Sequence, residues 1–128
     1  GDGHICANHS FNHMNGWQNK NDVYYNNIEK CDDFYTNRMF RPPHGRIKLS
    51  QYQKLKRKYK IVFWDVVSFD FDKNTSPEKC FENVKNYTRP GSIIVFHDSV
   101  KAKENLQYAL PRSIQYLKNE GYSFGLLE

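Results

Sequence analysis

Residues 76–97 read SPEKCFENVKNYTRPGSIIVFH, and this stretch decides the fold class. Ser76 is a good helix cap, Pro77 suits the first helical position, and an acidic residue follows them, so a helix is expected to begin here and to run to about Tyr87. After a Pro-Gly break, four apolar residues predict a buried strand that ends at His97. A helix followed by such a strand is part of the repeating unit of a parallel sheet.

The rest of the chain shows the same alternation of amphipathic and short apolar segments. The expected elements are, in order, a helix at 22–33, a strand at 38–40, a helix opened by Ser50, a strand at 60–64, a helix at 76–87, a strand at 92–97, a helix at 104–119 that ends at Gly121, and a last strand at 123–127. Strands that alternate with helices predict the α/β class with a parallel sheet.

The length and composition suit a single folded domain, residues 1–128. Hydrophobic residues make up 38% of the chain and aromatic residues 16%, which favours a packed core over a disordered segment. Trp17 and the Tyr24-Tyr25 pair are expected in that core and not on the surface as sugar platforms. No run approaches the roughly 20 apolar residues that span a bilayer, so no membrane span is expected. The first residues show no secretion signal, and three cysteines, an odd number, leave at least one thiol free.

The net charge of +5 raises the question of an anionic partner. Much of the excess lies in residues 48–60, KLSQYQKLKRKYK, where Lys54, Arg57 and Lys58 would share one helix face. We favour a solvated outer helix face, because nucleic-acid binding would need aromatic or donor groups on the same face together with a recognisable motif. No nucleic-acid partner is therefore expected.

Charged or titratable side chains follow several of the expected strands. In α/β folds such residues gather at the carboxyl edge of the sheet, where sites are built. In this chain the charged or titratable residues that follow expected strands are His9 after HICAN, Arg41 after RMF, Asp65 and Asp70 after IVFW, and His97 with Asp98 after IIVF. Of the other acids in this region, Asp65 is expected in a buried turn and Asp72 in solvent. A hydrophobic core alone does not require charged groups at the ends of several strands, so the sequence indicates a functional site.

Four stretches resemble motifs of a known family: GHICANHSFNH, FRPPHG, WDVVSFDFD and GSIIVFHDS. In this order and at these intervals they resemble the polysaccharide deacetylases, also called the NodB-homology domain or carbohydrate esterase family 4, from about Gly3 to Tyr122. The resemblance implies a distorted (β/α) barrel and a hydrolase that removes acetyl groups from N-acetylated or O-acetylated polysaccharides with a divalent metal, most often zinc. It also suggests a place at the cell envelope or outside the cell.

By this resemblance His9 and His13 match the two metal-binding histidines, and Ser10 stabilises the turn that carries them. The chemistry agrees, because residues four apart in a helical turn lie on one face with Cβ atoms about 5–6 Å apart, so both rings can reach one ion. Cys6 and the two histidines also form a C-x2-H-x3-H pattern, which leaves a structural zinc site open as an alternative.

The catalytic roles come from the same resemblance. Arg41 matches the arginine that orients the catalytic base, and the backbone N–H of His44 matches an oxyanion donor. His97 matches the general acid that protonates the departing amine, and Asp70 matches the acidic residue that supports it.

Three positions match the walls of the family's substrate groove: Pro43, Phe71 and Val95. Phe71 replaces a common Trp, Val95 replaces a common Leu, and His44 stands where the family usually has Tyr or Trp. We expect these changes to affect substrate preference more than reaction type.

The family's first motif has no counterpart in this sequence. It is an Asp-Asp pair on the first strand, which supplies the catalytic base and the third metal ligand, whereas Asp2 is the only acid ahead of His9. We therefore expect an incomplete barrel without the first strand and helix, inactive as it stands, whose unpaired sheet edge can form a homodimer. A non-catalytic carbohydrate-binding module and a partner-binding fragment stay open as alternative functions.

Overall fold

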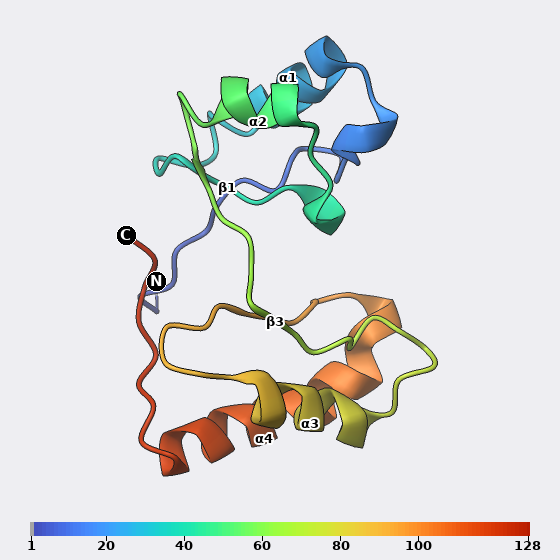
Figure 1. Cartoon of the computed structure of the whole chain (residues 1–128), viewed down its shortest axis with the longest axis vertical. Helices are drawn as coiled ribbons and strands as arrows, with labels where there is room; N and C mark the ends of the chain where they lie inside the picture. Colours follow the sequence, from blue (N-terminus) through green and yellow to red (C-terminus); the bar gives the residue numbers. More distant parts are fainter. Residues whose placement is uncertain (1) are drawn as a thin grey trace. The chain divides into compact units, whose positions relative to one another are not determined.

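The computed structural model describes residues 2–128 as a mixture of helices and short parallel strands (Figure 1). The chain divides into two compact units, each described by itself below. The first unit runs up to Phe63 and includes Leu126–Glu128, and the second unit is Trp64–Gly125. No helix among residues 2–128 combines the length and the apolar character needed to cross a membrane.

The first unit contains two helices and one parallel strand pair. Its elements are a 3-10 turn η1 (Gly16–Gln18), α1 (Asn21–Glu29), β1 (Met39–Phe40), a second 3-10 turn η2 (Pro43–Gly45), α2 (Leu49–Leu55) and β2 (Lys60–Ile61). β1 pairs with β2, and a single parallel bridge joins Asn8 to Phe40 on β1.

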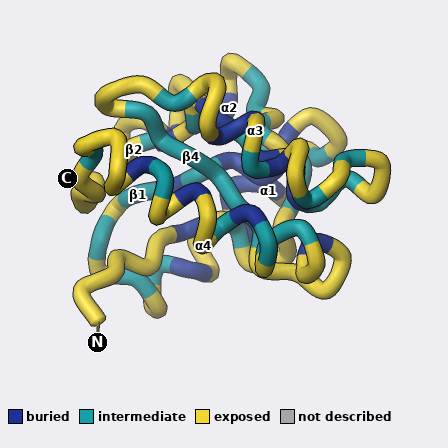
Figure 2. The backbone as a smooth tube through the Cα atoms, turned by 90° about the horizontal axis from the view of Figure 1, so that it is seen from below, coloured by how far each residue is buried: buried dark blue, intermediate teal, exposed yellow. Residues whose placement is uncertain are grey.

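The core of the first unit is mainly aromatic, as the composition predicts. It consists of Tyr24, Tyr25, Ile28, Phe40, Leu55 and Tyr59. The first three lie on one face of α1, because positions i, i+1 and i+4 of a helix fall within an arc of about 100°. Figure 2 marks the buried parts of the chain in dark blue.

The second unit holds two longer helices and another parallel strand pair. Its elements are β3 (Val66–Val67), α3 (Pro77–Tyr87), β4 (Ile94–Val95), the 3-10 turn η3 (Val100–Ala102) and α4 (Lys103–Asn119). β3 pairs with β4 in parallel. α3 and α4 pack together, and the rings of Phe81 and Tyr116 meet edge to face between them.

The start of α3 is the element that local sequence predicted best. The Ser76 hydroxyl accepts a hydrogen bond from the backbone N–H of Lys79, and Pro77 is the first helical residue. The prediction that Ser50 opens α2 is wrong: α2 begins at Leu49, and the Gln51 side chain accepts a bond from the N–H of Lys48 at the helix start.

The strand predictions need three corrections. β2 and β4 are each only two residues long, so that β4 ends before His97. β3 is a separate strand that the sequence did not predict, and it begins after Asp65. Segment 123–127 is described without strand structure, and the exposed side chains of Phe124 and Leu126 have no sheet to cover. The physical reason is common to all three: strands this short are set by their pairing partners and not by local propensity.

Candidate functional site

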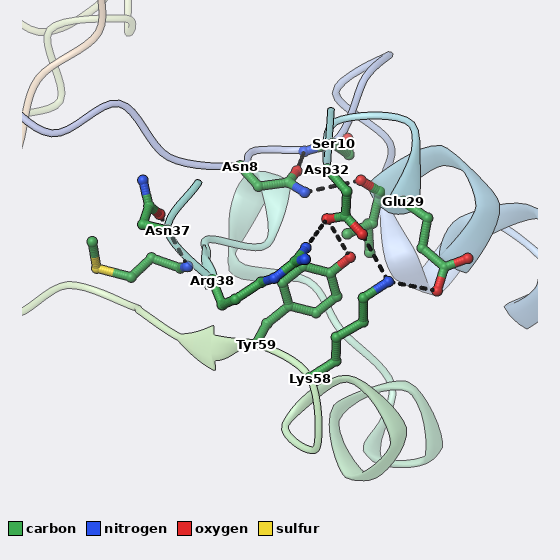
Figure 3. Close-up of polar contacts among 10 residues, drawn as sticks. Asn8, Ser10, Glu29, Asp32, Asn37, Arg38, Lys58 and Tyr59 are labelled. Atoms are coloured by element: carbon green, nitrogen blue, oxygen red, sulfur yellow. Dashed lines mark hydrogen bonds and ion pairs between the residues drawn. The ribbon is translucent and has the colours of Figure 1, made fainter. Parts of the chain in front are cut away.

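The turn that carries His9 and His13 is anchored by a buried asparagine, Asn8 (Figure 3). Its side-chain amide donates to the Ile28 carbonyl at 2.9 Å and its oxygen accepts from the N–H of Ser10 at 2.9 Å. The Ser10 hydroxyl in turn accepts from the N–H of Met14 at 2.8 Å. Ser10 therefore stabilises this turn, as the sequence predicted.

The turn is not helical, which corrects one expectation. Ser10 and His13 have φ values of 60° and 53°, in the left-handed region. The imidazoles of His9 and His13 nevertheless approach each other, with ring centroids 4.9 Å apart. His44 extends this series, because its ring lies 4.8 Å from that of His13. A sharp turn, and not a helical repeat, brings the two predicted ligands together.

The ring of His9 is oriented by a backbone carbonyl. Its Nδ1 lies 2.6 Å from the carbonyl oxygen of Arg41, so Nδ1–H donates there and the Nε2 lone pair is left for a ligand. Partial desolvation lowers the pKa of His9, and electrostatic interaction with His13, Arg41 and His44 acts in the same direction, although the bond to the Arg41 carbonyl opposes them. A neutral, oriented imidazole is the form that binds a metal.

These two imidazoles fit a zinc-like ion in their chemistry, although they are only two donors. Among residues 2–128, no group of three His, Cys, Asp or Glu side chains is arranged to hold a metal ion. This applies also to Cys6 with the two histidines, so the described residues give no support to a structural zinc site on the C-x2-H-x3-H pattern.

Arg41 begins the loop that follows β1. Its backbone N–H donates to the Asn8 carbonyl at 3.0 Å, and its guanidinium donates to the carbonyls of Val62 and Phe63, each at 3.3 Å. The two prolines that follow are fully buried, and His44 then takes a φ of 58°. The guanidinium thus fixes the backbone just beyond β2 while the prolines stiffen the loop.

In the second unit, Asp70 and His97 form a close pair. Asp70 is 0% exposed, and its Oδ1 lies 2.8 Å from Nδ1 of His97. Its Oδ2 accepts the backbone N–H of the same histidine at 2.6 Å. The ring of Phe71 meets the His97 ring edge to face at 4.9 Å between centroids. Both carboxylate oxygens therefore hold one histidine, which fixes its ring and leaves Nε2 to act.

The Asp70 segment is itself clamped from α4. The Asn105 side chain donates to the carbonyls of Asp70 at 3.1 Å and Thr75 at 3.0 Å. From α3, Asn83 donates to the Ser68 carbonyl at 3.1 Å. These amides hold the loop after β3, at which Phe69 takes a φ of 62°.

Comparisons with known proteins place these features in a family, although a scan of protein-family models finds no match. The peptidoglycan-N-acetylglucosamine deacetylase of Bacillus cereus is 30% identical over an alignment of 131 positions, and the alignment covers 96% of this chain and 47% of that protein. A crystal structure of a peptidoglycan N-acetylglucosamine deacetylase superposes with a TM-score of 0.85 at 31% identity. The superposition covers 98% of this chain and 62% of the deacetylase chain. The family 4 carbohydrate esterase from Streptomyces lividans gives a TM-score of 0.82 at 26% identity, over 97% of this chain and 66% of that one.

The comparisons support a polysaccharide deacetylase domain of carbohydrate esterase family 4. The chain spans about half the length of the Bacillus cereus relative, at 47%. The family resemblance of the motifs is thereby confirmed, and the residue roles it implies stay predictions.

Backbone strain marks the same motifs. Four non-glycine residues among those described have φ in the left-handed region: Ser10, His13, His44 and Phe69. Each is a predicted site residue or directly precedes or follows one. Such conformations cost of order 1–3 kcal/mol each and persist where surrounding contacts over-determine them, commonly at functional sites.

The three predicted groove residues differ in accessibility. Pro43 is fully buried, so its ring shapes the loop, whereas Phe71 and Val95 are half-buried. The groove itself stays a prediction.

Several other expectations about single residues are corrected. Trp17 is 59% exposed and not in the core, although Tyr24 and Tyr25 are buried as predicted. Asp65 is exposed and accepts the N–H of Ile93, whereas Asp72 caps the turn that contains Asn74 and Thr75. The expected burial of Asp65 is therefore wrong, and Asp72 is partly and not fully exposed.

Sequence reasoning missed two amides that hold predicted site residues, Asn8 in the first unit and Asn105 in the second. Each bonds to a residue at least 20 positions away, apart from the local bond of Asn8 to Ser10. The only signal was the position of Asn8, directly before His9.

Proposed function

We propose that the protein hydrolyses the carbon–nitrogen bond of an acetamido sugar in an N-acetylated polymer, with acetylated peptidoglycan as the substrate class that the Bacillus cereus relative's name supplies. The single observation that carries the proposal is the Asp70–His97 pair. A buried carboxylate that engages both Nδ1 and the backbone N–H of one histidine holds it in the tautomer and orientation of an acid–base catalyst.

His97 is the group that moves the proton in this proposal. Its side chain is 41% exposed while Asp70 is fully enclosed, so the ring can meet a substrate and the carboxylate cannot. When His97 is protonated, Nε2–H donates its proton to the nitrogen of the departing amine, and Asp70 stabilises the imidazolium until then.

The residues of the first unit would serve the carbonyl side of the reaction. His9 and His13 would hold the divalent metal, zinc by the chemistry of two imidazoles. When bound, that metal polarises the acetamide carbonyl and increases the acidity of water. The N–H of His44 would donate to the oxyanion, and Arg41 would orient the base.

The proposal also covers the finer features of the fold. In each unit a helix connects the two strands of a parallel pair along the chain. This connection supports a distorted (β/α) barrel, to which residues 1–128 would contribute one portion. The sequence has no counterpart of the Asp-Asp motif that supplies the base and the third ligand. Residues 1–128 on their own are therefore proposed to be inactive, and pairing of two copies through a strand edge is proposed as well.

The test replaces His97 in the full gene product. His97→Ala is expected to slow acetate release from an acetylated glucosamine oligomer by on the order of 10²–10⁴, the usual contribution of a general acid. Metal content, measured by atomic spectroscopy, should stay that of the parent, because His97 is not a proposed ligand. His4→Ala, at an exposed histidine outside the proposed site, is the matched control. Full turnover by His97→Ala, or loss of its metal, would remove the acid role.

A further inference from the structure

Trp17 is an exposed indole whose orientation is fixed. Its side chain is 59% exposed. Nevertheless its Nε1–H donates to the Ile47 carbonyl at 3.2 Å, and its backbone N–H donates to the side chain of Asn15 at 2.9 Å. The guanidinium of Arg46 lies over the ring, 5.3 Å from the centroid, within the range of a cation–π contact. The one polar atom of the indole is thus satisfied, and its ring is left partly open to solvent.

The backbone under Trp17 is anchored in the interior. Gly16 is buried, its N–H donates to the Arg46 carbonyl at 3.1 Å, and its carbonyl accepts from the side chain of Gln51 at 2.8 Å. Gln51 is 0% exposed. A Cβ on Gly16 would lie 2.6 Å from the Gln51 side-chain oxygen and 2.7 Å from the Arg46 carbonyl oxygen, so only glycine fits. A buried amide therefore holds the indole in place.

The indole belongs to the same two segments as the imidazole series. Segments 13–17 and 44–47 run beside each other: His13 meets His44 at one end, and Trp17 meets Arg46 and Ile47 at the other. Four residues of extended chain reach at most about 14 Å. Trp17 therefore lies within the span of a short oligosaccharide from the proposed metal-binding histidines.

The chemistry of this pair fits a sugar ring. A pyranose presents C–H bonds on one face, which suit the electron-rich face of an indole, and hydroxyl groups at its edge, which suit the N–H donors of a guanidinium. Single exposed apolar residues are common on protein surfaces. The difference here is the fixed geometry, which removes most of the ordering cost that a mobile aromatic side chain would pay on binding.

We propose that Trp17 and Arg46 form a carbohydrate-binding subsite that holds a sugar ring of the polymer other than the one being deacetylated. The proposal rests on the proposed function, because it takes the polymer as the ligand. In this subsite the ring of Trp17 stacks on the sugar and Arg46 donates to its hydroxyls. The subsite adds to polymer affinity and takes no part in bond breaking.

The experiment compares variants of the full gene product on an N-acetylglucosamine tetramer. Trp17→Ala should raise KM about 2- to 10-fold, the range expected for one aromatic stacking contact, with kcat within 2-fold of the parent. Trp17→Phe keeps a flat ring and should recover part of the loss. Phe34→Ala removes another exposed aromatic side chain of the first unit, 68% exposed, and should change neither constant. Thermal unfolding checks that each variant is folded.

Binding is measured separately, so that failure of the subsite and failure of the deacetylase function can be told apart. In a background in which Trp64 and any tryptophan outside residues 1–128 are replaced by Phe, Trp17 is the remaining tryptophan, and its fluorescence should change on titration with the tetramer. A fluorescence change without acetate release would retain the subsite and overturn the enzymatic function. Acetate release with an unchanged KM in folded Trp17→Ala and no fluorescence change would overturn the subsite.

Discussion

Asp32 in the first unit and Asp70 in the second unit each accept more than one hydrogen bond, but the groups that surround them differ. Asp32 in the first unit is 18% exposed at its side chain and contacts two permanent cations, Lys58 at 2.7 Å and Arg38 at 3.1 Å. It also accepts the hydroxyl of Tyr59 at 2.8 Å (Figure 3). Asp70 in the second unit is fully buried and holds one titratable ring, that of His97.

The difference shows what each carboxylate is for. Cations on long side chains neutralise Asp32 and tie the end of α1 to the segments before β1 and β2, which is a structural task. Asp70 is matched instead with a histidine, whose unperturbed pKa is the only one among side chains that lies between pH 5 and 8. Several hydrogen bonds alone therefore do not identify a carboxylate that supports catalysis. The kind of partner and the exposure of that partner identify it.

The largest expected effect is at Asp70. Asp70→Asn keeps the size of the side chain but places an amide where the charge holds His97. Because the histidine then loses its favoured tautomer and the stabilisation of its protonated form, acetate release by the full gene product should fall by about 10²–10⁴. Asp98→Asn removes the same charge one residue beyond His97, at an exposed position, and is the matched control. Equal rates for the parent and Asp70→Asn would reduce Asp70 to a structural role like that of Asp32.

Local signals and long-range contacts explain what the sequence could and could not predict. α3 was predicted well because Ser76 and Pro77 specify its start within four residues. β3 was missed because a two-residue strand depends on its partner, β4. The Asp70–His97 assignment came from the family resemblance, and only the structure supplied its distances.

The exposure of Trp17 and the partners of Asp32 were not predicted, and both have the same origin. Composition placed Trp17 in the core, but Gly16 takes the buried position and the 3-10 turn exposes the indole. The partners of Asp32 were not foreseen, since the hydroxyl of Tyr59 comes from 27 residues further along the chain. The sequence around Trp17 and around Asp32 does not specify contacts with residues so far along the chain.

A smaller effect is expected at Asp32, on stability and not on activity. Asp32→Asn weakens two ion pairs and a hydrogen bond to Tyr59. Because the side chains of Lys58 and Arg38 are 44% and 53% exposed, solvent screens much of the attraction, and we expect a loss of about 1–2 kcal/mol in the free energy of unfolding. Urea unfolding of the full gene product at neutral pH measures this, with kcat unchanged. Asp33→Asn, at the exposed neighbouring position, should change stability by less than about 0.5 kcal/mol. A large loss of kcat in a folded Asp32→Asn variant would erase the contrast between the two carboxylates.

The smallest effect is the pH dependence of that same stability difference. Desolvation by itself would raise the pKa of Asp32, but hydrogen bonds from Lys58 and Tyr59 and the charges of Lys58 and Arg38 outweigh it and hold the pKa below its ordinary value. The unfolded chain, with an ordinary Asp pKa of about 3.9, therefore takes up a proton before the folded chain does as the pH falls. The stabilisation from Asp32 is complete above that pKa and is lost as the pH falls through the lower, folded-state pKa.

The stability gap between the parent and Asp32→Asn should consequently be constant from about pH 5 to pH 7 and shrink below about pH 4. Other acids whose pKa is lowered, such as Asp72, are present in both proteins, so their contribution cancels in the difference. Tyr59, whose pKa is raised to about 12 by desolvation and by Asp32, titrates far above this window and adds nothing to it. Urea midpoints measured at several pH values between 3 and 7 give the curve. A gap that grows as the pH falls would mean that desolvation outweighs the cations and raises the pKa of Asp32. That outcome would contradict the lowered pKa that the contacts of Asp32 imply.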